Sequence, residues 1–82
     1  MEEQIGKIIH YYDKIGVAVV RLDSGFKVGD TIHVKGKSTD FEQAVGSMQL
    51  DHKNVEMGKA GEEVAVKLDG KAREGDVVYR KS

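Results

Sequence analysis

Short runs in which apolar and polar residues alternate follow one another along the chain. Alternation with a period of two is typical of half-buried β-strands, and β-branched and aromatic residues are frequent in these runs. Turns rich in glycine, aspartate and serine separate the runs. The strands that this pattern predicts lie at residues 5–12, 15–22, 31–35, 41–50, 63–68 and 77–80. Because no segment of helical length shows a 3.6-residue period, the pattern predicts an all-β fold.

The same alternation divides the strand residues between an inner and an outer face. The residues expected inside are Ala18, Val20, Leu22, Ile32, Val34, Val64, Val66 and Leu68. In the first strand Lys7 marks the outer face. Counting from this lysine places Ile8, His10 and Tyr12 inside. The first two strands are expected to form a hairpin with its tip near Asp13.

Residues 45–68 contain two apolar runs separated by a polar excursion. The excursion meets the apolar side at Val55 and ends in a glycine turn, which predicts an out-and-back loop held at its middle. Within the first run the inward phase changes. A β-bulge at Gly46–Ser47 would place both Val45 and Met48 inside.

The edges of the predicted sheet need protection from pairing with other chains. The chain has no proline with which to interrupt an edge strand, so closure into a barrel is the expected solution. With 82 residues there is room for one domain, which we expect to span residues 1–82 with an ordered core at about residues 5–80. The predicted fold is a small closed antiparallel β-barrel of six to seven strands.

Composition narrows the classes of partner. The chain carries 13 Lys and Arg against 14 Asp and Glu, which disfavours strong nucleic-acid binding through phosphate neutralisation. The absence of cysteine excludes disulfides and cysteine-ligated metal sites. No apolar run is long enough to span a membrane, and the N-terminus is acidic where a secretory signal would be basic. We therefore expect a cytoplasmic protein that contacts no membrane.

The histidines and loop motifs do not form a recognisable catalytic or cofactor site. His10, His33 and His52 lie on separate predicted elements, without the paired spacing of zinc ligands, so no metal is expected. Asp51 and His52 are adjacent on one loop, whereas the groups of a catalytic triad converge from different elements. Residues 36–38, Gly-Lys-Ser, end like a phosphate-binding loop but lack its first glycine and its helix. We expect no enzymatic activity, no cofactor and no bound nucleotide.

Two surfaces are candidates for partner binding. Lysines on predicted loops, among them Lys14, form either a basic rim at one barrel end or an ordinary solvated surface. The second surface lies on the outer face of the first hairpin and consists of Ile9, Tyr11, Val17 and Val19. An exposed apolar patch of this kind is typical of a protein partner or of self-association. The alternative is that the strand phase changes there, which would turn part of the patch inward.

Four motifs carry a resemblance to a known family. They are Gly-Phe-Lys-Val-Gly-Asp-Thr-Ile at 25–32, Val-Gly-Ser-Met at 45–48, the segment 55–64 ending in Lys-Ala-Gly-Glu-Glu-Val, and Arg-Glu-Gly-Asp-Val at 73–77. In this order they resemble the second domain of translational GTPases of the elongation factor Tu type, over nearly the whole chain. The resemblance implies a small closed β-barrel. Since the GTP-binding domain of those factors is absent, it also implies a non-enzymatic binding module.

The resemblance further implies a role in protein biosynthesis. In that family the barrel supports binding of the aminoacylated tRNA end or of ribosomal RNA, which implies RNA binding with a tRNA, rRNA or ribosome-associated partner. The candidate contact residues at the rim are Lys14, Gln49 and His52. Similar barrels also occur as accessory domains, for instance at the end of a peptidase family once described as collagenase-like. The alternative function is a protein-interaction, oligomerisation or accessory domain that uses the outer face of the first hairpin.

Overall fold

The computed structural model describes residues 2–81, and these residues form β-strands joined by turns. No helix within them has the length and apolar character needed to cross a membrane. The strands are β1 (Glu2–Tyr12), β2 (Val17–Leu22), β3 (Phe26–Lys27), β4 (Thr31–Lys35), β5 (Asp40–Ala44), β6 (Met48–Leu50), β7 (Lys53–Asn54), β8 (Met57–Gly58), β9 (Glu63–Lys67) and β10 (Val77–Lys81). The all-β prediction is therefore confirmed.

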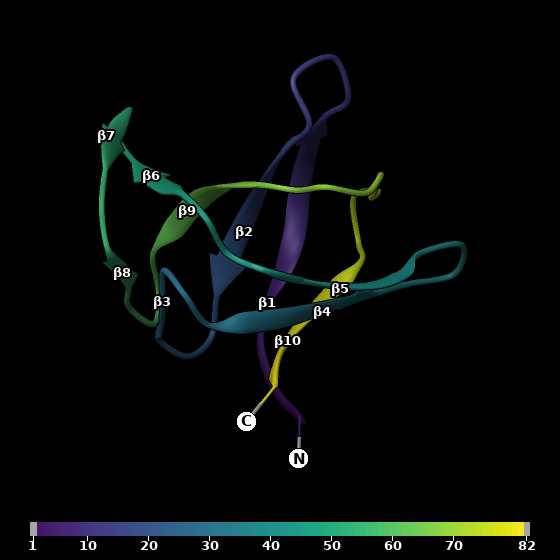
Figure 1. The fold of residues 1–82 in the computed structure, drawn as a ribbon, viewed down its shortest axis with the longest axis horizontal. Helices are drawn as coiled ribbons and strands as arrows, with labels where there is room; N and C mark the ends of the chain where they lie inside the picture. Colours follow the sequence, from purple (N-terminus) through teal and green to yellow (C-terminus); the bar gives the residue numbers. More distant parts are fainter. Residues whose placement is uncertain (1, 82) are drawn as a thin grey trace.

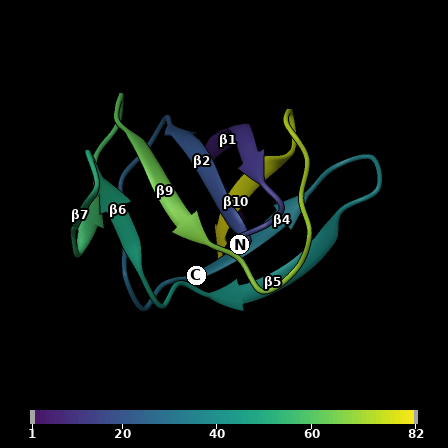
Figure 2. The same ribbon diagram turned by 90° about the horizontal axis from the view of Figure 1, so that it is seen from above.

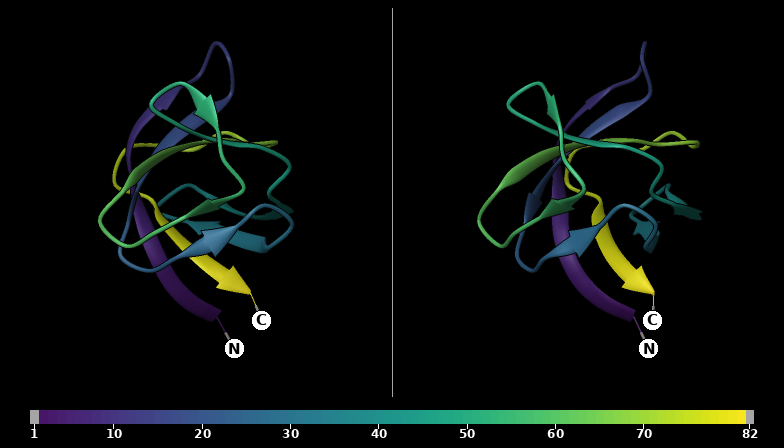
Figure 3. Two further views of the ribbon diagram at one scale, coloured as in Figure 1. Left: turned by 90° about the vertical axis from the view of Figure 1, so that its left-hand side faces the viewer. Right: turned by 60° about the vertical axis from the view of Figure 1, so that its left-hand side comes forward.

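Most of the strands belong to one curled sheet. Its order is β5-β4-β10-β1-β2-β9-β6-β7, with neighbouring strands antiparallel. β3 and β8 pair separately as a two-stranded sheet (Figure 1). Figure 2 shows how the large sheet curves around an interior, with β9, β2 and β1 on one side and β4 and β5 on the other. β1 and β10 run side by side towards the two ends of the chain (Figure 3).

The concave side of the large sheet holds the core. Every residue that the alternation of strands 15–22, 31–35 and 63–68 placed inside is buried, so this prediction is confirmed. These side chains are mostly valine, isoleucine and leucine, whose shapes fit the half-buried surface of a pleated sheet. The remaining buried apolar residues are Ile5, Ile8, Phe26, Val45, Met48, Ala72 and Val78.

β1 departs from regular alternation in its second half. Its pairing with β2 skips Ile9, because the register shifts between Ile8 and His10. The inserted residue is a β-bulge, which reverses the phase of the side chains that follow. As a result His10 and Tyr12 are about half exposed, and Tyr11 packs against the core instead. The prediction that His10 and Tyr12 point inward is therefore wrong.

The single strand predicted at residues 41–50 is two strands with different partners. β5 pairs with β4, whereas β6 pairs with β9 and β7. Residues 45–47 belong to neither, and they carry the chain from one part of the curled sheet to another. This crossing takes the place of the bulge expected at Gly46–Ser47. Val45 and Met48 are nonetheless both buried, as predicted.

The sheet is open, so the prediction of a closed barrel of six to seven strands is wrong. β5 and β7 are its outermost strands, and the ladders of the described residues do not join them. The inward side chain of Gln43 on β5 reaches the end of β9 instead. Its Nε2 donates to the Lys67 carbonyl at 2.9 Å, and its Oε1 accepts from the Asp69 N–H at 2.6 Å. Side-chain hydrogen bonds thus span the gap that a backbone ladder would close.

The predicted out-and-back loop is a short hairpin formed by β6 and β7. Leu50 pairs with Lys53, which leaves Asp51 and His52 as a two-residue turn with φ angles of 52° and 64°. Positive φ at both central residues is what a type I′ hairpin turn requires. Val55 is half-buried against the core, and its N–H donates to the first carbonyl of β6 at 3.0 Å. As predicted, this valine holds the loop at its middle.

Candidate functional site

The outer face of β2, β9 and β6 carries a groove of about 390 Å³, which we call the outer groove. Valine and alanine side chains form its floor, and polar side chains form its rim. The residues that line the outer groove are Tyr12, Ile15, Val17, Val19, Gln49, Asp51, His52, Glu63 and Ala65.

The register of three antiparallel ladders builds the floor of the outer groove. Val19 pairs with Ala65 across β2 and β9, and Ala65 pairs with Gln49 across β9 and β6. Val17, which lies two residues before Val19 on β2, pairs with Tyr12 on β1. Residues directly opposite one another in an antiparallel pair share a face, so these five side chains form one continuous surface.

The rim of the outer groove is held in place from two sides. At the β6 side, Gln49 Nε2 donates to Asn54 Oδ1 at 3.1 Å, and the turn of Asp51 and His52 lies beside this pair. At the hairpin side, Lys67 Nζ donates to the Ile15 carbonyl at 3.0 Å. These contacts hold the Gln49 side chain and the Ile15 backbone on two sides of the apolar floor, although the Ile15 side chain itself is largely exposed.

Four residues proposed from the sequence meet in this groove. Val17 and Val19 come from the expected protein-binding face, and Gln49 and His52 come from the expected rim. The sequence treated these as separate surfaces, because only the pairing of β2 with β9 brings the two together. For the same reason it did not identify Ala65, which lies at the centre of the floor.

The other three proposed residues lie elsewhere. Lys14 is exposed in the turn between β1 and β2, beside a separate depression that His10 also lines. Ile9 is exposed at the bulge and does not line the outer groove. Tyr11 packs against the core, so its expected place on the outer face is wrong. The bulge explains the positions of Ile9 and Tyr11, since it changes the direction of every later side chain of β1.

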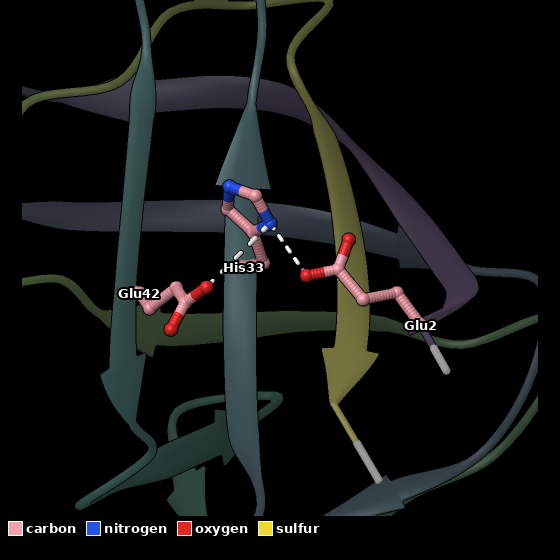
Figure 4. Close-up of side chains that lie close together, drawn as sticks. All are labelled: Glu2, His33 and Glu42. Carbon is pink, nitrogen blue, oxygen red and sulfur yellow. Dashed lines mark hydrogen bonds and ion pairs between the residues drawn. The ribbon is translucent and has the colours of Figure 1, made fainter.

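A second polar site, which we call the His33 cluster, consists of His33, Glu2, Asp40 and Glu42. His33 projects from the outer face of β4, and its side chain is 12% exposed. Its Nδ1 faces Glu2 and Glu42 (Figure 4). This nitrogen lies 2.6 Å from Glu2 Oε2 and 4.0 Å from Glu42 Oε2. Its Nε2 lies 2.5 Å from Asp40 Oδ1. Glu42 comes from the paired strand β5, whereas Glu2 on β1 reaches past β10.

The carboxylates favour the protonated form of His33. Hydrogen bonds to Asp40 and then to Glu2 raise the pKa of His33 above its ordinary value, outweighing the opposite effect of desolvation. The same contact lowers the pKa of Asp40, because the imidazolium stabilises its carboxylate. When His33 is protonated, Nδ1–H donates to Glu2 and Nε2–H donates to Asp40.

Little in the sequence points to the His33 cluster. Paired histidines at short spacing are the usual sequence sign of a metal site, whereas this cluster has one histidine and three carboxylates. The useful signal was that His33 points outward from a predicted strand, next to the acidic segment that contains Asp40 and Glu42. Glu2 could not be found in this way, since it joins the cluster only through the order β1-β10-β4.

A larger hollow, of about 570 Å³, lies beside β3 and β10. Its residues are Gly25, Phe26, Lys27, Asp30, Met57, Arg80 and Lys81. The Arg80 guanidinium already donates to the Gly25 carbonyl at 3.2 Å and pairs with Glu3 at 2.5 Å. Asp30 and Lys81, which also line the hollow, are likewise bonded within the domain, to the Lys27 N–H and to Glu42. We therefore regard the outer groove and the His33 cluster as the better candidate sites.

Comparisons with known proteins give relatives by sequence and by fold. No family model matches the chain. It is 48% identical over 77 residues to an uncharacterized protease of Methanocaldococcus jannaschii, a match that covers 93% of this chain and 19% of the protease. It is 31% identical over 78 residues to a collagenase of Porphyromonas gingivalis, covering 93% of this chain and 22% of the collagenase. The chain thus spans about one fifth of the length of these relatives.

A solved structure shares the fold. The C-terminal domain of a Geobacillus thermoleovorans protein described as a U32 peptidase superposes with a TM-score of 0.91 and 17% identity. The superposition covers 98% of this chain and 93% of that domain. At this identity the likeness is one of fold alone.

These matches overturn the expected kinship with elongation factor Tu-type domains, and with it the translation-factor and RNA-binding function. Three of the four motifs behind that expectation are glycine turns followed by an acidic residue, which suit many small β-domains. Over nearly all of its length the chain is similar to segments of a protease and a collagenase, and its fold is that of a U32 peptidase C-terminal domain.

Proposed function

We propose that this chain is a non-catalytic accessory domain of the U32 peptidase type, which contacts protein through the outer groove. The observation that carries the proposal is the 48% identity to about one fifth of a protease. The solved structure that shares the fold is described as the C-terminal domain of such a peptidase. We infer that catalysis belongs to the other parts of these larger proteins.

The chemistry of the outer groove suits a protein surface. Val17, Val19 and Ala65 offer an apolar floor at the centre of three paired strands. Gln49 and His52 at the rim supply hydrogen-bonding groups around it. An apolar centre with a polar rim is the usual composition of a transient protein interface. The proposed contact is with the catalytic portion of a peptidase.

Chemical-shift mapping tests this proposal. The ¹⁵N-labelled chain would be titrated with the M. jannaschii protease from which the matching segment has been removed. We expect saturable shifts at Val17, Val19, Gln49 and Ala65. Val17→Lys places a charge on the apolar floor and is expected to abolish these shifts, because desolvating an unpaired ammonium opposes docking.

Val77→Lys is the matched control. Val77 is a half-buried valine on the outer side of β10, away from the outer groove. This variant should bind as the unmodified chain does. If the shifts are absent, or if Val77→Lys removes them as completely as Val17→Lys does, the groove is not the contact surface.

A further inference from the structure

We propose that Glu2, His33 and Glu42 form a binding site for a divalent transition-metal ion of the zinc type, with Asp40 as the residue that orients His33. The site is independent of the proposed protein contact. It lies on the outer face of β4 and its neighbours, whereas the outer groove lies on β2, β9 and β6.

The three ligand groups come from separate places in the sequence and converge on one point. One ligand atom from each of Glu2, His33 and Glu42 lies within 4.8 Å of the other two. Zinc bonds of about 2.0–2.1 Å in tetrahedral geometry place ligand atoms about 3.3 Å apart. The Nδ1 of His33 is 2.6 Å from Glu2 and 4.0 Å from Glu42, so each carboxylate needs to move by less than about 1 Å.

Asp40 gives His33 the arrangement of a metal ligand. Its Oδ1 lies 2.5 Å from Nε2, whereas Glu2 and Glu42 lie nearest to the other ring nitrogen, Nδ1. A carboxylate that accepts from the remote ring N–H fixes the tautomer and leaves the other nitrogen free to bind a metal. When the ion binds, Nδ1 releases to solvent the proton it carries in protonated His33 and presents its lone pair to the ion, while Nε2 keeps its proton.

The charges around the site favour a dication. Most other carboxylates that have a bonding partner pair with a basic side chain, as Glu3 does, or accept from the N–H of a turn, as Asp30 does. Glu2 and Asp40, by contrast, both converge on the single His33. Two lysines oppose the ion. Lys35 lies opposite Asp40 on the paired strand. Lys81 Nζ lies 3.0 Å from both oxygens of Glu42. This exposed lysine competes with the ion for Glu42.

The ligand set selects the class of metal. One imidazole nitrogen and two carboxylate oxygens suit zinc and its neighbours in the first transition series, whereas calcium and magnesium prefer oxygen ligands alone. Three protein ligands leave a further position for water or another oxygen donor.

Calorimetric titration of the chelator-treated full chain with zinc chloride tests the site. We expect one equivalent of zinc to bind. His33→Asn should weaken binding by about 100-fold or more, and Asp40→Asn by about 10- to 100-fold, since orienting partners have effects of that size. Lys81→Met should tighten binding by several-fold, because it removes the competitor for Glu42. His10→Asn is the control and should leave the affinity unchanged.

Ring ¹⁵N spectra identify the bound nitrogen. On addition of zinc, the His33 Nδ1 resonance should move to the position of a metal-bound nitrogen while Nε2 keeps its proton. The proposal is overturned if one millimolar zinc does not bind, if His33→Asn binds as tightly as the parent chain, or if Lys81→Met weakens binding. All the substituted side chains point outward, so far-ultraviolet spectra should show the same fold in every variant. The outer groove is unchanged in them, so failure here leaves the proposed protein contact unaffected.

Discussion

The side-chain amide of Gln43 bonds to Asp69 as a backbone peptide would. Its oxygen accepts from the Asp69 N–H at 2.6 Å, while its nitrogen donates to the carbonyl of Lys67 at 2.9 Å. In a regular ladder a neighbouring strand would supply this pair of bonds. One buried glutamine therefore joins β5 to the end of β9 where the sheet itself is open.

Replacing this amide should destabilise the fold. Gln43→Leu keeps the size of the side chain but leaves the Lys67 carbonyl and the Asp69 N–H without their partner. An unsatisfied buried polar group costs about 1–3 kcal/mol, so we expect the free energy of unfolding to fall by about 2–4 kcal/mol. Urea denaturation followed by circular dichroism measures the change.

Gln49→Leu provides the comparison for Gln43→Leu. Gln49 is exposed and bonds only to the side chain of Asn54. Its replacement should change the free energy of unfolding by no more than about 0.5 kcal/mol. Equal effects of the two substitutions would show that Gln43 has no special part in joining the sheet.

The His33–Asp40 pair should make stability depend on pH. In the folded state the pKa of His33 is raised above 6.5, so its contribution is complete below that value and is lost as the pH rises through the raised pKa. The pKa of Asp40 is lowered from 3.8, so its contribution is present above 3.8 and is lost as the pH falls through the lowered pKa. Stability from this pair is therefore greatest between about pH 4 and pH 6.5.

Thermal unfolding at a series of pH values, in the presence of a chelator, checks this dependence. His33→Gln should flatten the decline on the alkaline side. His10→Gln should leave the profile as it is, although His10 also faces a carboxylate, Glu74, at 3.3 Å. A profile unchanged by His33→Gln would contradict the prediction.

Gly6 is expected to tolerate no side chain. A Cβ atom at this position would lie 2.5 Å from the carbonyl oxygen of Arg21 and 2.8 Å from Val20 Cγ1, so strands β1 and β2 would have to move apart. We expect Gly6→Ala to reduce the free energy of unfolding by about 1–3 kcal/mol. At Gly46 a Cβ meets no atom within 4 Å, and Gly46→Ala should be neutral or slightly stabilising. Chemical denaturation of both variants separates the two cases.

The turn between β6 and β7 should become more stable when His52 is replaced by glycine. His52 has a φ of 64°, a conformation that glycine adopts without strain. His52→Gly is therefore expected to raise the free energy of unfolding by about 0.5–1 kcal/mol. His10→Gly, within the strand β1, should lower it, because glycine is unfavourable inside a strand. A loss of stability in His52→Gly would show that contacts of the imidazole outweigh the backbone strain.

Alternation in the sequence was enough to predict the interior of β2, β4 and β9. These strands are regular, so Val20, Val34 and Val66 lie where a period of two places them. The same rule failed for the second half of β1, because an inserted residue at Ile9 reverses the phase. A bulge depends on the partner strand as well as on the strand itself, and a single sequence does not show the partner.

The link that Gln43 makes across the open sheet and the two candidate sites could not be predicted from the sequence, for a related reason. Gln43 reads as an ordinary polar residue in a strand, and only the curled sheet turns it towards Lys67 and Asp69. The outer groove and the His33 cluster likewise depend on which strands are neighbours. The glycine turns suggested the barrel of elongation factor Tu-type domains, but such turns describe how the chain bends and do not identify its family.

The pairing of Glu2 with Lys81 places the start of β1 and the end of β10 side by side at one end of the β1–β10 ladder. When the two ends are pulled apart, the load falls first on this outermost pair and then on the next one. The hydrogen bonds of the ladder would break one after another, as in a zipper, rather than together in shear. The domain is therefore built to yield at low force when stretched through its two terminal strands.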